Sequence, residues 1–123
     1  MIVSIGNAVV MLCAGGVSMG VVDESLVREF STSLKDALGG NVRKIILYGS
    51  RARGDYSADS DYDFIVVVAS HSKGVRDLVI DIEVDILDKY GEVISSLLYD
   101  EDEWSRECRY PLGINVQREG VLV

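Results

Sequence analysis

Residues 47–68 read LYGSRARGDYSADSDYDFIVVV, and in this stretch a polar loop separates two apolar runs. The first run stops abruptly at Gly49 and Ser50, and short apolar runs of this kind are typical of buried strands. After ten intervening residues, Asp61 and Asp63 form a D-x-D pair at the head of the second run. The pattern predicts two buried strands, with a glycine-serine corner after the first and two carboxylates opening the second.

Each part of this pattern has a chemical use. Glycine at the end of a strand lets the backbone approach a phosphate closely, and the following serine offers a hydroxyl and an amide to the same anion. Asp61 and Asp63 are two residues apart, so on a strand both carboxylates point to one side. Such a pair is costly unless cations neutralise it, and two Mg²⁺ ions held between carboxylates and a triphosphate would do so.

The loop between the two halves contributes Arg51 and Arg53, which would add positive charge to the phosphates. Taken singly, the glycine-serine pair is most simply a turn, the arginines a solvated loop and the aspartates surface charges. Their joint spacing, with a strand before each half, favours a nucleotide site.

At this point the sequence resembles the minimal nucleotidyltransferases, the small branch of the polymerase-beta-like nucleotidyltransferase superfamily. Residues 47–55 and 60–63 carry the resemblance most clearly, within a dense region at 44–68 and looser likeness at 89–91 and 118–121. It implies transfer of a nucleoside monophosphate, AMP from ATP or the equivalent from another NTP, with Mg²⁺ as the cofactor. The residues matching the motif are then catalytic, metal-binding and nucleotide-binding: Asp61 and Asp63 for the first two roles, and Gly49, Ser50, Arg51 and Arg53 for the third.

Active members of this superfamily usually add a third carboxylate from a neighbouring strand, and its position here depends on residues 75–90. With a period of two this segment is a strand that presents Asp85. With a helical period it is an amphipathic helix, which we prefer because its length exceeds that of a typical strand. The next strand is then 93–99, and Ser95 or Ser96 stands where an acid is wanted.

The resemblance also implies a partner. Many minimal nucleotidyltransferases are paired with a HEPN-domain ribonuclease as antitoxin and toxin, and the acceptor is a tyrosine hydroxyl of that toxin. The alternative is a catalytically impaired antitoxin that binds a nucleotide, or acts by contact alone. A third hypothesis, transfer to a small molecule such as an aminoglycoside, would need a substrate domain for which 123 residues leave little room.

The rest of the chain predicts mostly helices. Helical patterns occupy residues 23–38 and 100–109, Pro111 interrupts the second of them, and a further short helix is expected at 112–119. Together with the strands they predict an α/β (α+β) protein in which helices flank a small mixed sheet, as the polymerase-beta-like nucleotidyltransferase fold implies.

The composition restricts the choice of partner. The formal net charge is −8, from 20 acidic and 12 basic residues, which disfavours extended nucleic acid but suits cation-bound triphosphate or a basic protein. Cys13 and Cys108 are too far apart to suggest a zinc or disulfide framework, and His71 belongs to a polar loop. We expect a cytoplasmic protein with no membrane association, as a homo- or hetero-oligomer.

The amino terminus is unusual because residues 1–22 contain no charged residue. The stretch is too polar for a transmembrane helix and lacks the basic start of a signal peptide. Two interpretations stay open: a misassigned extension with the true start at Met19, or a packed terminal strand or helix. Residues 23–123 are expected to form a single nucleotidyltransferase domain.

Overall fold

The computed structural model of the chain describes residues 2–5, 8–11, 24–57 and 60–123. Cys13, the alternative start at Met19 and Asp23, the first residue of the expected helix, lie outside these ranges. Within them no helix has the combination of length and apolar character that crossing a membrane requires. The elements, in chain order, are β1 (Ile2–Ile5), β2 (Ala8–Met11), α1 (Glu24–Leu38), the 3₁₀ turn η1 (Gly39–Asn41), β3 (Val42–Tyr48), α2 (Gly49–Arg53), β4 (Tyr62–Val68), α3 (Lys73–Tyr90), β5 (Ile94–Asp100), α4 (Glu101–Glu107), α5 (Pro111–Glu119) and β6 (Val121–Leu122).

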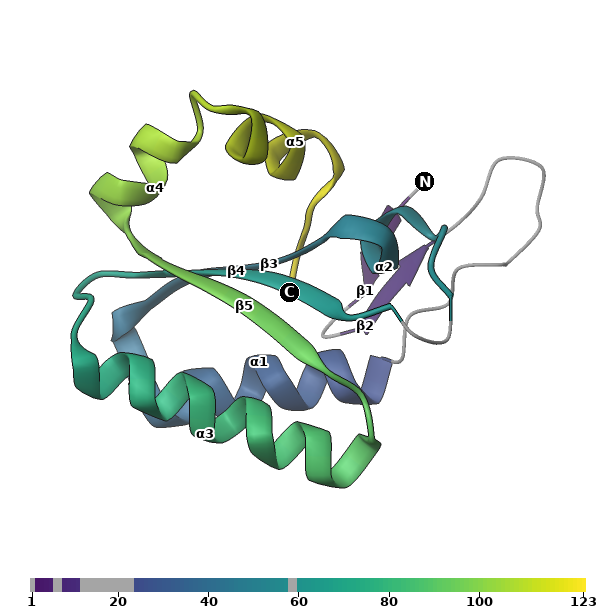
Figure 1. Cartoon of the computed structure of the whole chain (residues 1–123), viewed down its shortest axis with the longest axis horizontal. Coiled ribbons are helices and arrows are strands. Elements are labelled where there is room, and N and C mark those ends of the chain that lie inside the picture. Colours follow the sequence, from purple (N-terminus) through teal and green to yellow (C-terminus); the bar gives the residue numbers. More distant parts are fainter. Residues whose placement is uncertain (1, 6–7, 12–23, 58–59) are drawn as a thin grey trace.

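A four-stranded mixed sheet lies at the centre, in the order β5-β4-β3-β6 (Figure 1). β3 pairs antiparallel with β4 and with the short β6, whereas β4 and β5 run parallel. Helix α3 makes the crossover between the two parallel strands, as a parallel connection requires. β1 and β2 form a separate antiparallel hairpin. The predicted small mixed sheet flanked by helices is confirmed.

The ambiguous segment 75–90 is helical, and it is part of α3. The Ser72 side chain caps the first turn by accepting a hydrogen bond from the Val75 amide, and Gly91 ends the helix with a left-handed φ of 69°. The strand interpretation of this segment is therefore wrong. The helix wins because its buried residues, Val79, Ile82 and Ile86, recur at helical spacing against the sheet.

Two helical layers cover the two faces of the sheet (Figure 1). Helices α1 and α3 cover one face, and their apolar side chains pack in a single core with those of the strands, including Phe30, Phe64 and Ile82. Helices α4 and α5 cover the other face, where Trp104 and Val116 pack against Ile65 and neighbouring strand residues. Alternate residues of β4 therefore enter different cores.

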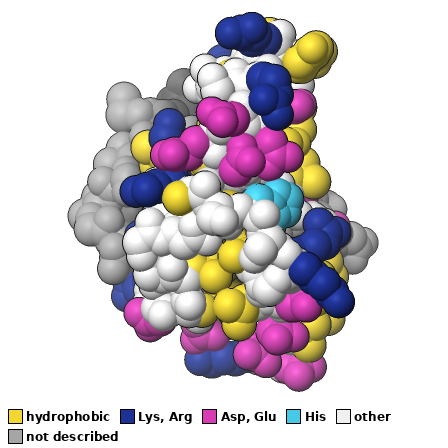
Figure 2. Space-filling view, turned by 90° about the vertical axis from the view of Figure 1, so that its left-hand side faces the viewer, with side chains coloured by type: hydrophobic (Ala, Val, Ile, Leu, Met, Phe, Trp, Pro, Cys, Tyr) yellow, Lys and Arg dark blue, Asp and Glu magenta, His cyan; other side chains and the backbone are white. Residues whose placement is uncertain are grey.

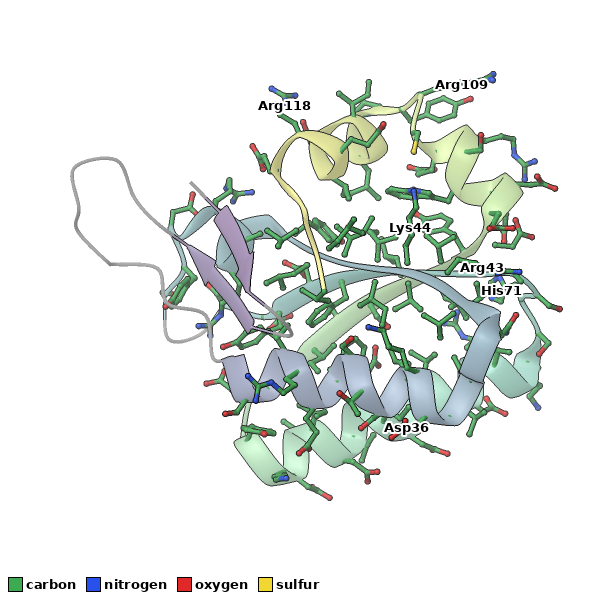
Figure 3. All side chains as sticks on the ribbon, turned by 180° about the vertical axis from the view of Figure 1, so that it is seen from behind. Asp36, Arg43, Lys44, His71, Arg109 and Arg118 are labelled. Atoms are coloured by element: carbon green, nitrogen blue, oxygen red, sulfur yellow. The ribbon has the colours of Figure 1, made fainter. Side chains whose placement is uncertain are left out.

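The end of the sheet at which β4 and β5 finish is closed by local polar contacts. Asp100 and Glu103 form a reciprocal capping box at the start of α4, at 2.7 and 2.9 Å. Glu103 also lies 3.2 Å from the ring of His71, and Figure 2 shows the one histidine of the chain directly below a group of acidic side chains. Arg43, at the same end as His71 in Figure 3, pairs with Glu101 at 3.6 Å.

Candidate functional site

The glycine-serine corner lies at the opposite end of the sheet, where β3 passes directly into α2. Gly49 has a φ of +76°, a conformation that favours glycine. A Cβ atom at this position would lie 2.5 Å from Oδ2 of Asp63. The corner thus needs glycine for two reasons, and the Asp63 carboxylate lies directly against its backbone.

Three neighbouring strands place their side chains together at this corner. Asp63 on β4 is opposite Tyr48 on β3 and beside Ser95 on β5. Residues in register across a sheet share a face, so all three point toward the face that α4 and α5 cover. Tyr62, the residue before Asp63, instead enters the core beneath α1 and α3.

The Asp63 carboxyl is held in an environment that disfavours its charge. Burial raises the pKa of Asp63 most, the negative charge of Asp61 raises it further, and Arg53 partly offsets both. The pKa of Tyr48 is raised as well, first by burial and then by the charge of Asp63. Two carboxylates therefore act on one another at the corner, which is the arrangement that a bound cation relieves.

Arg51 has a different environment from the one expected for a phosphate ligand. Its side chain is 7% exposed, and its guanidinium lies 4.3 and 4.4 Å from the ring centroids of Tyr56 and Tyr62. It donates two hydrogen bonds to the carbonyl of Ser60, at 2.9 and 3.2 Å, and lies 3.4 Å from Glu92. These contacts fasten the polar loop to the sheet immediately before Asp61, but they direct the guanidinium away from the corner.

Arg53 is the arginine whose charge acts on the Asp63 carboxylate. It is 43% exposed and pairs with Asp55 at 3.2 Å and with Glu119 at 3.3 Å. Its charge nevertheless lowers the pKa of Asp63, so its field reaches the site. Of the predicted residues, the structure brings Gly49, Asp63 and Arg53 together with Asp61 and Ser50 beside them.

Among the described residues, no third acid joins Asp61 and Asp63 in a group suited to a metal. Asp85 is exposed on α3, which covers the opposite face of the sheet from Asp63. Ser95 takes the register position beside Asp63, while Ser96 points the other way and donates a hydrogen bond to Glu83. No group of three or more His, Cys, Asp or Glu side chains suited to a metal is formed within residues 25–57 and 60–123.

Two features of the site could not be expected from the motif. Glu119 reaches Arg53 across 66 residues of sequence, and no local pattern announces such a contact. The clamp on Arg51 needs Tyr56, Tyr62 and Glu92 together, and only the first two lie in the motif. The available signal was one tyrosine within the polar loop and one just after it.

Comparisons with known proteins agree with this geometry. Residues 27–110 match the family model described as a nucleotidyltransferase domain. Protein MJ0604 of Methanocaldococcus jannaschii, provisionally named a protein adenylyltransferase, is 37% identical over 98 residues, which cover 80% of this chain and 94% of that protein. MJ0141 of the same organism carries the same provisional name and is 31% identical over 75 residues, 60% of this chain and 76% of that one.

A solved structure shares the fold. It is described as a toxin-antitoxin with AMP-PNP, and it superposes with a TM-score of 0.52 at 18% identity, over 76% of this chain and 68% of that chain. The family match spans the corner and every residue that the sequence pattern singled out.

Proposed function

Because this chain belongs to the nucleotidyltransferase domain family, we propose that it is a Mg²⁺-dependent enzyme that transfers AMP from ATP to a hydroxyl group of a partner protein. The observation that carries the proposal is the approach of the Asp63 carboxylate to the backbone at Gly49. A triphosphate bound at the corner would lie beside the carboxylates that hold its cations. The provisional name of MJ0604 supports a protein as the acceptor.

The residues at the corner have complementary roles in this proposal. The backbone at Gly49, the amide and hydroxyl of Ser50 and the charge of Arg53 bind the phosphates. Asp61 and Asp63 hold Mg²⁺, which their chemistry as paired carboxylates suits. When bound, two such ions would orient the triphosphate and stabilise the departing pyrophosphate. Arg51 supports the loop that carries Asp61.

The reaction forms one P–O bond at the α-phosphorus and breaks another. The acceptor hydroxyl oxygen attacks the α-phosphorus of ATP, the bond to the bridging oxygen breaks, and pyrophosphate leaves. The hydroxyl proton passes to solvent water, because Asp61 and Asp63 hold the cations in this proposal. Ser95 beside Asp63 is uncharged, at the position where the family resemblance implies a third acid.

The proposed partner is a HEPN-domain ribonuclease, with this chain as the antitoxin of the pair. The fold shared with a toxin-antitoxin that was solved with AMP-PNP supports this assignment. A cytoplasmic location follows from an RNA-cleaving partner.

Labelled ATP tests the proposal directly. Incubation with Mg²⁺ and a cognate HEPN-domain protein should label that protein, and Asp61→Asn and Asp63→Asn should each abolish labelling. Asp85→Asn is the matched control, because it removes the same charge from the opposite face and should leave labelling intact. Equal labelling by all four proteins would overturn the assigned roles.

One observation favours a second candidate function. Ser95 stands beside Asp63 where a third carboxylate would complete the metal site, so the chain would serve as a nucleotide-binding or contact-only antitoxin. Toxin inhibition that survives both Asp61→Asn and Asp63→Asn, without any labelling, would support this alternative.

A further inference from the structure

We propose that β5 and α3 form a two-fold interface with a second copy of this chain. The two edges of the sheet differ: β6 has only two residues, whereas β5 is an edge strand of seven. Natural proteins protect long edge strands with lysine, proline or a bulge. The sequence of β5, ISSLLYD, contains neither lysine nor proline, and its pairing with β4 is regular. Within the part of the chain that the structure describes, no strand pairs with its outer backbone edge.

An apolar stripe on α3 lies beside this edge. Ile80, Val84 and Leu87 recur at helical spacing and are 43, 50 and 44% exposed. Glu83 is the helical neighbour of Ile80 and Leu87, and it accepts a hydrogen bond from Ser96 of β5. That bond fixes the side of α3 that carries the stripe: it is the side next to β5.

The stripe and the strand share one midpoint, which is what a two-fold axis needs. The centre of β5 is Leu97, and the Glu83–Ser96 hydrogen bond brings the middle of α3 to this centre. An axis there pairs β5 antiparallel with its copy and continues the sheet to eight strands. It also sets α3 antiparallel to its copy, with Ile80 against Val84 of the second copy.

One pair of opposite charges on α3 fits the same axis. If Ile80 faces Val84 of the second copy, then Arg76 faces Asp88, because both pairs are symmetric about Ile82. Arg76 and Asp88 are exposed and lie near the two ends of α3. Unlike charges thus meet twice in an antiparallel pair and would not meet in a parallel one.

The size of this face predicts a dimer of modest strength. A helix of 18 residues is about 27 Å long, and a helix layer on a sheet is about 20 Å deep, so each copy buries roughly 540 Å². The total of roughly 1,080 Å² is near the lower limit for a specific interface. The corner at Gly49 stays open, and this inference does not depend on the proposed function.

Sedimentation of the purified chain over about 1 to 200 µM tests the inference, because modest interfaces dissociate in this range. The wild type should pass from monomer to dimer, and Val84→Asp should stay monomeric. Leu78→Asp is the matched control: Leu78 is 41% exposed on α3 but lies off the stripe, so dimerisation should persist. Circular dichroism should show that all variants are folded.

A charge exchange gives the stricter test. Arg76→Asp and Asp88→Arg should each weaken dimerisation about tenfold, and the double variant should recover it. A monomer at every concentration would overturn the inference and leave the face to a different protein. Equal loss of dimerisation in Leu78→Asp and Val84→Asp would also overturn the inference. So would a double variant that dimerises no more tightly than the single variants.

Discussion

Both ends of the central sheet carry closely spaced carboxylates, and the two groups are held in opposite ways. Where β5 ends, Asp100 and Glu103 accept hydrogen bonds from each other's backbone amides, and the pKa of Glu103 is lowered, first by the Asp100 amide and then by His71. Where β4 begins, Asp61 and Asp63 repel one another, and the pKa of Asp63 is raised, mostly by burial. The first pair is satisfied within the chain, whereas Arg53 only partly offsets the repulsion in the second, which suits the cations proposed above.

The largest effect is expected for Gly49→Ala. The new Cβ would lie 2.5 Å from the Asp63 carboxylate, on a residue with a φ of +76°. Displacing that carboxylate should lower the rate of AMP transfer by about 100-fold or more, since the metal contributes several kcal/mol. Gly91→Ala is the control, because it changes a glycine with a similar φ of 69° and open surroundings. Comparable losses in both variants would mean that strain alone, not the corner, is responsible.

The next largest effect is a difference in stability between variants of the two arginines of α2. Arg51→Met removes a buried guanidinium from two tyrosine rings, the Ser60 carbonyl and Glu92, and should lower the free energy of unfolding by about 2–3 kcal/mol. Arg53→Met removes only exposed ion pairs and should cost less than about 1 kcal/mol. Urea titrations measure both values, and equal losses would contradict the structural role of Arg51.

At the end of the sheet where β5 finishes, Asp100→Ala should lower the free energy of unfolding by about 1 kcal/mol. The substitution removes the Asp100 side chain from the capping box of α4. AMP transfer should not change, because Asp100 and Asp63 lie at opposite ends of the sheet. A loss of transfer in a folded Asp100→Ala protein would show that the two ends are not separate.

The smallest effect concerns pH. Because the Asp63 pKa is higher in the folded protein than in the unfolded chain, its charge destabilises the ligand-free protein above that pKa, and the penalty disappears as pH falls. Asp63→Asn should therefore raise the free energy of unfolding at pH 7 by about 0.5–1 kcal/mol, and this gain should shrink as pH falls and vanish only below the unfolded pKa. The effect of Glu103 on stability has the opposite sign, because its pKa is lowered in the folded protein. Its charge stabilises the fold above the unfolded pKa, and this stabilisation is lost as pH falls through the folded pKa.

Much of the fold could be predicted because local patterns were consistent. The helical period and the length of 75–90 favoured a helix over a strand, and α3 spans Lys73–Tyr90. Helices were expected at 100–109 and 112–119 with a break at Pro111, and α4 and α5 are separated just before that residue.

The candidate site was predictable only where its residues lie close together in the sequence. The ten-residue spacing placed Gly49 and Asp63 at adjacent strand ends because antiparallel neighbours joined by one loop meet there. It could not distinguish Arg51 from Arg53, since burial between Tyr56 and Tyr62 depends on the tertiary fold. The parallel register that sets Ser95 beside Asp63 depends likewise on the α3 crossover.

Calorimetry of AMP-PNP binding, with and without Mg²⁺, tests most directly whether Asp63 and Gly49 form a cation-dependent triphosphate site. The wild type and Asp85→Asn should bind AMP-PNP equally and only with Mg²⁺, whereas Asp63→Asn should lose at least about tenfold in affinity, or about 1.4 kcal/mol. Binding by Asp63→Asn as tight as that of the wild type in the presence of Mg²⁺ would contradict this account.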